Sequence, residues 1–322
     1  MPLPADAHLP DETGRIVTDP ERFCTGHALA AGEPLAGWGA HQARNILIRW
    51  PKGRWEHSLR IAAGMPDELI AAINAAVEAR WRINLIDRKS DQNTCVLLYP
   101  QALQFTVEPS DLPALIRAII DEGDLTSFAS QPTTRKTILV CTHGKHDACC
   151  AKWGFAAYKA IAEKAADHEG VFDVWEATHL GGCRFAGGAL VLPAGRKYGR
   201  LVPADAMPLL QAEAQNLPYL PAFRGSSMRE APAQVAEIAA LKHLPPGTLC
   251  HHVVEIAGSS PERTYRVETS QGNLLVRCDP GEISSYGACS DLKAKKPLKP
   301  KTIWTGHVLS IVPISKTEST SI

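Results

Sequence analysis

The stretch ILVCTHGKHDACCAKWG (138–154), followed after a helical run by EATHLGGCRFAGG (176–188), decides how the rest of the chain is interpreted. Three of the nine cysteines, Cys141, Cys149 and Cys150, lie within ten residues, and Cys183 follows His179 at a spacing of four. Thiol and imidazole groups are ligands for soft and borderline metals. Their concentration in two short segments therefore indicates a metal or redox centre, for which the remainder of the chain is the scaffold.

Length and composition are those of an ordinary globular chain. The 322 residues suffice for about two domains, and 45% of them are hydrophobic and 21% charged. The 34 basic and 34 acidic residues cancel, so the chain has no overall attraction for a polyanion. We therefore expect no binding of nucleic acid.

The beginning of the chain shows no targeting signal. MPLPADAHLPDETGR lacks the basic and apolar regions of a signal peptide, and no apolar run approaches the ~18 residues that span a bilayer. We expect a cytoplasmic protein that does not enter a membrane. In that compartment cysteines are more often ligands or redox groups than disulfide partners.

The N-terminal part is predicted as a flexible tail (1–20) and a module over 21–128. Residues 22–42 read as a Gly/Ala-rich loop, where the C-x-x-H pair of Cys24 and His27 is best interpreted as a buried cysteine and an unrelated histidine. From residue 45 the pattern predicts the order β-α-β-β-β-α. Strands are expected at 45–50, 82–88, 95–100 and 103–109, and helices at 65–80 and 110–121.

The same order is predicted again for a second module, over 129–225, after a polar linker at 122–134. Strands are expected at 136–141, 171–177, 186–193 and 197–202, and helices at 150–165 and 203–215. EPSDLPALIRA (108–118) aligned with VPADAMPLLQA (202–212) matches at four positions. We therefore predict an α/β fold of two related modules in tandem, of which only the second keeps metal ligands.

A C-terminal extension over 226–322 is predicted to contain one helix and to be rich in β-strands. The helix is expected at 231–243, and strands at 249–257, 264–270, 273–279 and 303–314. The lysine-rich run DLKAKKPLKPK (291–301) is interpreted as a solvated loop.

The placement of the cysteines on these elements indicates one shared site. Cys141 closes a strand, and Cys149 and Cys150 open the next helix, where the amide dipoles favour anionic sulfur. His179 and Cys183 lie in a second loop, whose two glycines permit a close backbone approach. Loops that leave the ends of neighbouring strands can meet, and together they offer three thiolates and one imidazole.

The residues alone leave several classes of protein open. A zinc-binding structural module would use the same Cys₃His set, although the spacing from 141 to 150 is longer than usual for zinc. A thiol oxidoreductase would use Cys149 or Cys150 as the nucleophile, with His143 or His146 lowering its pKa. The C-x-x-C motif of thioredoxins is absent.

The motifs resemble those of the sucrase/ferredoxin-like family. The pattern consists of C-x-H-x₆-C from Cys141 to Cys150, HLGGCRFAG from 179 to 187 and YGR from 198 to 200, and EPLAG (33–37) is similar to the family's N-terminal part. The resemblance implies thioredoxin-like modules, the second a [2Fe–2S] ferredoxin. It implies Cys141 and Cys150 on the inner iron and His179 and Cys183 on the outer iron, with Cys149 as the alternate to Cys150.

The function expected on this basis is that of a one-electron carrier or redox sensor, more than that of a catalyst. A cluster with one neutral imidazole in place of a thiolate is less negative, so its reduction potential is expected to exceed that of all-cysteine ferredoxins. We expect an unidentified redox protein as partner. Four cations near the cluster loops are candidates for docking an acidic partner: Arg184, Arg196, Lys197 and Arg200.

Overall fold

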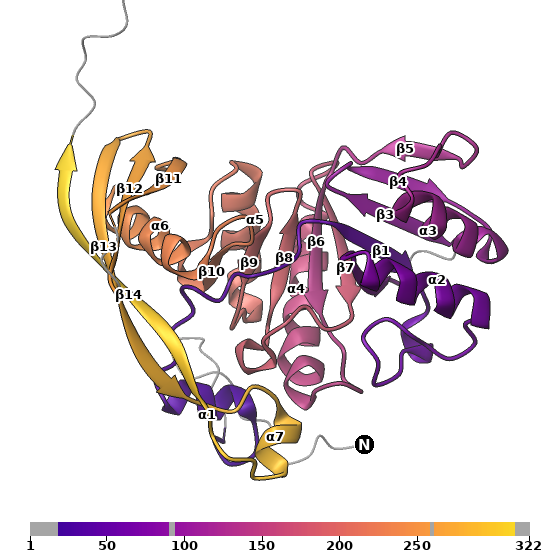
Figure 1. The fold of residues 1–322 in the computed structure, drawn as a ribbon, viewed down its shortest axis with the longest axis horizontal. Coiled ribbons are helices and arrows are strands. Elements are labelled where there is room, and N and C mark those ends of the chain that lie inside the picture. The colour runs from indigo at the N-terminus through magenta and orange to yellow at the C-terminus, as the bar shows by residue number, and fades with distance from the viewer. Residues whose placement is uncertain (1–18, 90–93, 258–260, 313–322) are drawn as a thin grey trace, which may run out of the picture.

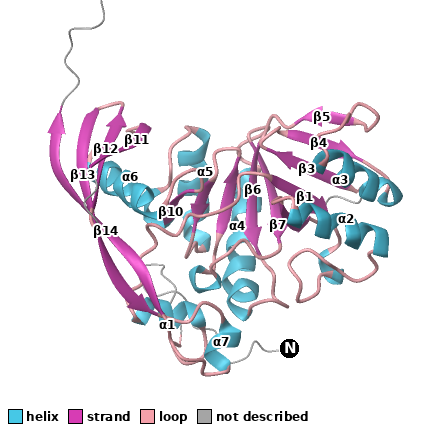
Figure 2. Cartoon of the chain, viewed as in Figure 1, coloured by secondary structure: helices cyan, strands magenta, loops and turns pink. Residues whose placement is uncertain are grey.

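The computed structural model describes residues 19–89, 94–257 and 261–312 (Figure 1). The expected flexible tail thus lies almost wholly outside the described residues. The chain has a mixed α/β fold, with a ten-stranded sheet at its centre and a separate four-stranded sheet (Figure 2). Among the described helices, none is long and apolar enough to cross a membrane.

The first half of the large sheet contains four strands and two helices. These elements are β1 (Asn45–Arg49), α2 (Asp67–Glu78), β2 (Arg82–Asp87), β3 (Cys95–Tyr99), β4 (Leu103–Thr106) and α3 (Leu112–Ile120). Strand β1 pairs parallel with β2 and antiparallel with β3, and β3 pairs antiparallel with β4. Helix α2 was expected over 65–80 but begins directly after Pro66, and Asp67 and Glu68 lie in its first turn.

The second half repeats this pairing. Its elements are β6 (Lys136–Cys141), α4 (Phe155–Ala165), β7 (Phe172–Ala177), β8 (Ala189–Leu192), β9 (Arg196–Tyr198) and α5 (Ala206–Ala214). Strand β6 pairs parallel with β7 and antiparallel with β8, and β8 pairs antiparallel with β9. The strand expected at 197–202 is shorter because Arg200 has a positive φ of 56°, which a strand does not accommodate.

The two halves are joined edge to edge in one sheet. Strands β2 and β7 pair antiparallel, with Ile86 opposite Ala177 and Asp87 opposite Glu176. The strand order is β10-β9-β8-β6-β7-β2-β1-β3-β4-β5. The outer strands are β5 (Ser130–Pro132) and β10 (Phe223–Ser226). Strand β5 lies within the expected linker and, although it follows the expected boundary at residue 129, it pairs with β4 of the first half.

Side chains of alternate residues along the strands pack in different hydrophobic cores. Ile46 and Ile48 of β1 pack in the core that includes α2 and α3, and Ile138 and Val140 of β6 pack in the core that includes α4 and α5. The intervening residues, such as Leu139, join a third core that spans both halves and contains the cysteines 141, 149, 150 and 183. The cysteines of both candidate loops are therefore packed within this shared core.

The N-terminal segment differs from expectation. Residues 22–42 were expected as a loop, but Cys24–Ala30 form helix α1. Its Thr25 hydroxyl donates to the carbonyl of Cys183, 3.3 Å away, so α1 lies against the second half, although the segment was assigned to the first module. The Gly/Ala-rich sequence has no helical periodicity to predict α1, because four of its seven residues are buried.

The C-terminal part begins with α6 (Ala231–His243), which packs on the four-stranded sheet. That sheet consists of β11 (Cys250–Ala257), β12 (Arg263–Thr269), β13 (Gly272–Ser284) and β14 (Pro300–Val312). Strands β13 and β14 extend beyond the sheet as a long two-stranded arm, which leads to the short helix α7 (Cys289–Lys293), next to α1 (Figure 1). The helix occupies the start of the lysine-rich run that was expected to be a loop.

Candidate metal centre

The first loop of the candidate centre connects β6 to α4. Cys141 is the last residue of β6, and Cys150 opens the π-helical turn Cys150–Gly154 that precedes α4. The turn comes very close to the strand end, because a Cβ on Gly154 would lie 2.0 Å from the carbonyl oxygen of Cys141. Only glycine therefore permits Cys141 and Cys150 to approach each other in this way.

The second loop leaves β7 at the same edge of the sheet. Cys141 and Ala177 are opposite each other in the parallel pairing of β6 with β7, so His179 lies just beyond the end of β7. Gly181 and Gly182 then adopt positive φ values of 94° and 83°, and Cys183 begins a 3₁₀ turn. These left-handed residues turn the chain back, which brings Cys183 next to His179.

Basic side chains donate hydrogen bonds to the carbonyl oxygens of the second loop. Arg82 donates to the carbonyl of His179, and Arg224 donates to that of Gly181 at 3.2 Å. Lys197 donates to the carbonyl of Leu180 at 2.8 Å. Burial lowers the pKa of Lys197 well below its usual range and, together with Arg184, that of Arg224 to about 9.

The expected ligands converge at this edge. Suitable atoms of Cys141, Cys150 and His179 all lie within 4.8 Å of one another. The Sγ atom of Cys183 lies 3.2 Å from Nδ1 of His179. The three thiols are buried and the imidazole is half-buried. His179 thus links an inner pair of thiols to Cys183.

These side chains change one another's pKa values. A hydrogen bond from Cys150 holds the pKa of Cys141 well below its usual range. Hydrogen bonds from Cys150, His146 and His179 lower that of Cys183 to about 3. Burial lowers the pKa of His179, but hydrogen bonds to the two thiols outweigh it and raise the value to about 9. The surroundings therefore favour the thiolate, the form in which cysteine binds metals, at Cys141 and Cys183. The pKa of Cys150 is instead raised well above its usual range, because its thiol donates hydrogen bonds to these two and is buried.

The two adjacent cysteines go to different places. Cys150 lies with Cys141 and His179, whereas Cys149, the alternate ligand, lies with Cys24 and Cys289. Successive residues on a helix point about 100° apart, which accounts for the separation. Cys150 as a ligand, with Cys149 as its alternate, stays a prediction.

His146 is a further candidate ligand that the expected set omits. It forms a second group with His179 and Cys183, whose ligand atoms lie within 4.8 Å of one another. Its ring centroid is 4.4 Å from that of His179. The signal in the sequence was its place in the C-x-H-x₆-C segment, where it was considered only as a helper for a nucleophilic thiol.

The four cations expected to dock a partner are engaged inside the protein. Arg184 donates to Glu33 at 2.6 Å, and Arg196 pairs with Glu213. Lys197 is 2% exposed, and Arg200 donates to the carbonyl of Glu33. Their hydrogen-bond partners lie within the protein, and the partner of Arg196 belongs to helix α5.

Comparisons with known proteins place the chain in a family. No curated protein matches it. Solved structures that resemble it include the thioredoxin-like [2Fe–2S] ferredoxin from Aquifex aeolicus, at 17% identity and a TM-score of 0.25, covering 28% of this chain and 95% of that one. A cysteine-to-serine variant of it also matches, at 17% identity and a TM-score of 0.25, covering 27% of this chain and 96% of that one. The family model described as sucrase/ferredoxin-like matches residues 35–225, more than half of the sequence, so the chain belongs to the sucrase/ferredoxin-like family.

Proposed function

We propose that the chain binds one [2Fe–2S] cluster and serves as a one-electron carrier or redox sensor. The observation that carries the proposal is the convergence of three buried thiols and one imidazole from the ends of two parallel strands. Cysteine thiolates and histidines are the protein ligands of such clusters, which gain and lose one electron at a time. The family and the donor set point to the same cofactor.

The residues present fit a two-iron cluster because they form two pairs. Cys141 and Cys150 are hydrogen-bonded to each other, and His179 and Cys183 are 3.2 Å apart. We assign the first pair to the inner iron and the second to the outer iron, where the half-buried His179 is nearer to solvent. Cys149 is left out of this set.

The surroundings of the centre favour a raised reduction potential. A neutral imidazole in place of one thiolate makes the whole centre less negative. Two arginines, Arg82 and Arg224, donate to carbonyl oxygens of the second loop. Positive charge near the site stabilises the reduced, more negative state, so both features act in the same direction.

Histidines mark the face where electrons would leave. The rings of His57 and His146 lie 5.2 Å apart, and His146 is 4.4 Å from His179. His57 is exposed, and a cleft of ≈ 370 Å³ lined in part by His143 and Phe155 opens beside the same loop. We propose that an unidentified redox protein docks here, where its own redox group would be nearest to the outer pair.

We also infer that the two halves of the large sheet are related modules. The support is the repeated pairing, in which each half has one parallel strand pair and two antiparallel ones in the same order. A crystal structure in which β1–β4 with α2 fail to superpose on β6–β9 with α4 would contradict this inference.

A thiol oxidoreductase is less well supported. Cys149 and Cys150 are 0% and 3% exposed, and a nucleophilic thiol needs access to its substrate. A purely structural zinc module remains the competing assignment for the same ligands. The metal content of the protein separates the two.

The test is chemical analysis of protein purified without oxygen. We expect a red-brown colour and about two irons and two sulfides per chain. Cys141→Ala, Cys150→Ala, His179→Ala and Cys183→Ala are each expected to lose or reshape the visible spectrum. Cys250→Ala is the matched control, because this thiol lies on β11, outside all the candidate ligand groups.

Two results would contradict the proposal. Colourless protein with zinc bound to Cys141 and Cys150 would make the centre structural. A spectrum that is lost in Cys149→Ala but kept in Cys150→Ala would mean that the ligand assignment is wrong.

A further inference from the structure

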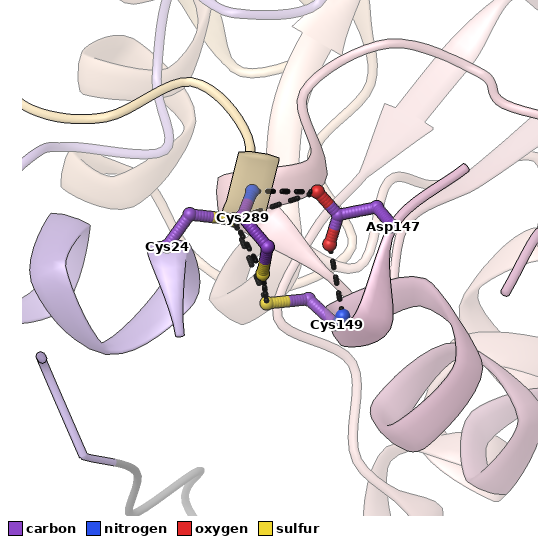
Figure 3. A group of neighbouring side chains, drawn as sticks. All are labelled: Cys24, Asp147, Cys149 and Cys289. Atoms are coloured by element: carbon purple, nitrogen blue, oxygen red, sulfur yellow. Dashed lines mark hydrogen bonds between the residues drawn. The ribbon is translucent and has the colours of Figure 1, made fainter. Parts of the chain in front are cut away.

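A second group of metal-binding side chains lies beside the candidate centre. It consists of Cys24, Asp147, Cys149 and Cys289, whose ligand atoms are all within 4.8 Å of one another (Figure 3). Cys24 opens α1, Cys149 immediately precedes the π-helical turn, and Cys289 opens α7. We propose that these four residues bind one zinc ion, which fastens α1 and α7 to the first loop of the candidate centre.

The spacing of the donor atoms suits a single tetrahedral ion. The Sγ atom of Cys149 lies 3.5 Å from that of Cys24 and 3.2 Å from that of Cys289, and the remaining Sγ–Sγ distance is 3.6 Å. Zn–S bonds of about 2.3 Å in a tetrahedron place the sulfurs about 3.8 Å apart. A small outward movement of the three thiols therefore makes room for the ion.

The fourth donor is a carboxylate that is already oriented. Oδ2 of Asp147 lies 3.9 Å from Sγ of Cys24 and accepts the backbone N–H of Cys289 at 2.8 Å. Its Oδ1 accepts the N–H of Cys149 at 2.9 Å (Figure 3). Hydrogen bonds of this kind fix the direction of carboxylate ligands in metal sites.

Burial and charge favour an occupied, closed site. Cys24 and Cys149 are fully buried, and Asp147 and Cys289 are each 3% exposed. In the described part of the chain, the hydrogen-bond partners of the Asp147 carboxylate are backbone amides and thiols, and none of them is a cation. Burying acidic groups without a positive partner is costly, and a divalent ion supplies that charge. Four protein donors leave no open position, as in structural zinc sites.

The site gives the C-terminal arm a role. Cys24 and Cys289 are 265 positions apart, and the arm formed by β13 and β14 delivers α7 to α1. A polar contact beside the site holds the same arm, because the buried Glu33 bonds to Ser285 and to Arg184. An ion here would hold α1 and α7 against the first loop, which carries Cys150 of the other centre.

The test is zinc analysis of the full-length protein, with iron and sulfide measured on the same samples. We expect about one zinc per chain in the native protein and a fall to below about 0.1 in Cys24→Ser and Cys289→Ser. Cys250→Ser is the control and should keep its zinc. Because this site is separate from the [2Fe–2S] assignment, a protein with zinc but no iron would overturn the proposed function and leave this site in place.

The serine variants could fail to fold, so a second measurement is made on the native chain. X-ray absorption at the zinc edge should show three sulfurs at about 2.3 Å and one oxygen at about 2.0–2.2 Å. Native protein without zinc would overturn the proposal, as would zinc retained in both serine variants. A thiol count that is two lower than expected, with no zinc, would instead assign a disulfide to Cys149 and Cys289.

Discussion

The two halves of the large sheet have the same strand pairing but differ at the ends of their first strands. In the second half, β6 ends on the thiol of Cys141. In the first half, β1 is followed by Trp50, whose carbonyl accepts the indole N–H of Trp55 at 2.9 Å, and both rings are buried. The alternation of apolar residues within the strands sets the strand pairing. The residues at the end of each first strand decide whether that end of the strand carries indole rings or candidate metal ligands.

The half without ligands still contributes to the centre. The carbonyl of Glu56 lies 2.6 Å from Nε2 of His143, in the first cluster loop. Arg82 and Asn84 of β2 both donate to the carbonyl of His179, in the second loop. The second half thus carries the candidate ligands, and the first half holds the loops on which they lie.

The largest effect expected from the comparison is on stability, in the first half. Ile73 on α2 is fully buried in the core of that half, so Ile73→Ala should lower the free energy of unfolding by about 2–5 kcal/mol. The visible spectrum of the folded protein should not change, because no ligand lies in that core. Urea unfolding and absorption measure the two effects.

Asn74→Ala is the matched control for this change. Asn74 is exposed on the same helix, so its removal should alter stability by less than about 0.5 kcal/mol. A bleached spectrum in folded Ile73→Ala would show that the two halves are not separable in this way.

The second prediction changes the ligand half alone. His179→Cys should keep the cluster and lower its midpoint potential by on the order of 100 mV, because a neutral imidazole is replaced by a thiolate. A redox titration followed by absorption measures the shift, with His57→Ala as a control on the exposed ring. An unchanged potential would remove His179 from the ligand set, and His146→Cys would then test the neighbouring ring.

The third prediction concerns the approach of helix to strand that is special to the second half. Gly154→Ala places a methyl group 2.0 Å from the carbonyl oxygen of Cys141 and should cost about 1–3 kcal/mol of stability. The Gly154→Ala protein should also lose its iron faster than the native protein, because the added methyl group separates Cys141 from Cys150. Gly53→Ala, in the first half, has nothing within 4 Å of the added carbon and should be nearly silent. Equal effects in the two variants would count against a special fit at Gly154.

The strand ends that carry the candidate ligands could be expected from the sequence, because the signals there are local. Cys141 and His179 each stand at or just after the end of an apolar strand, and neighbouring parallel strands end at one edge of a sheet. The separation of Cys149 from Cys150 follows from helix geometry once the helix is known to start there.

The second group of cysteines left no such signal. Cys24 and Cys289 meet through tertiary packing over 265 positions, and no local pattern encodes that contact. Helix α1 was missed because its buried residues are small and show no clear period, and α7 because it is only five residues long. The continuous sheet was missed for a related reason, because the β2–β7 pairing joins strands from different halves through two residue pairs.

The smallest effect is expected where the two halves meet at the surface. Lys145 of the first cluster loop pairs with Glu56 of the first half at 3.5 Å, and both side chains are 52% exposed. Solvent and salt screen such a pair, so Lys145→Ala should cost less than about 0.5 kcal/mol. A double-mutant cycle with Glu56→Ala measures the coupling of the two charges directly. A coupling above about 1 kcal/mol would show that the ion pair fastens the halves together. A value near zero would leave that task to the β2–β7 pairing and to the backbone contacts around His143, and Lys145 would then be free to meet a partner.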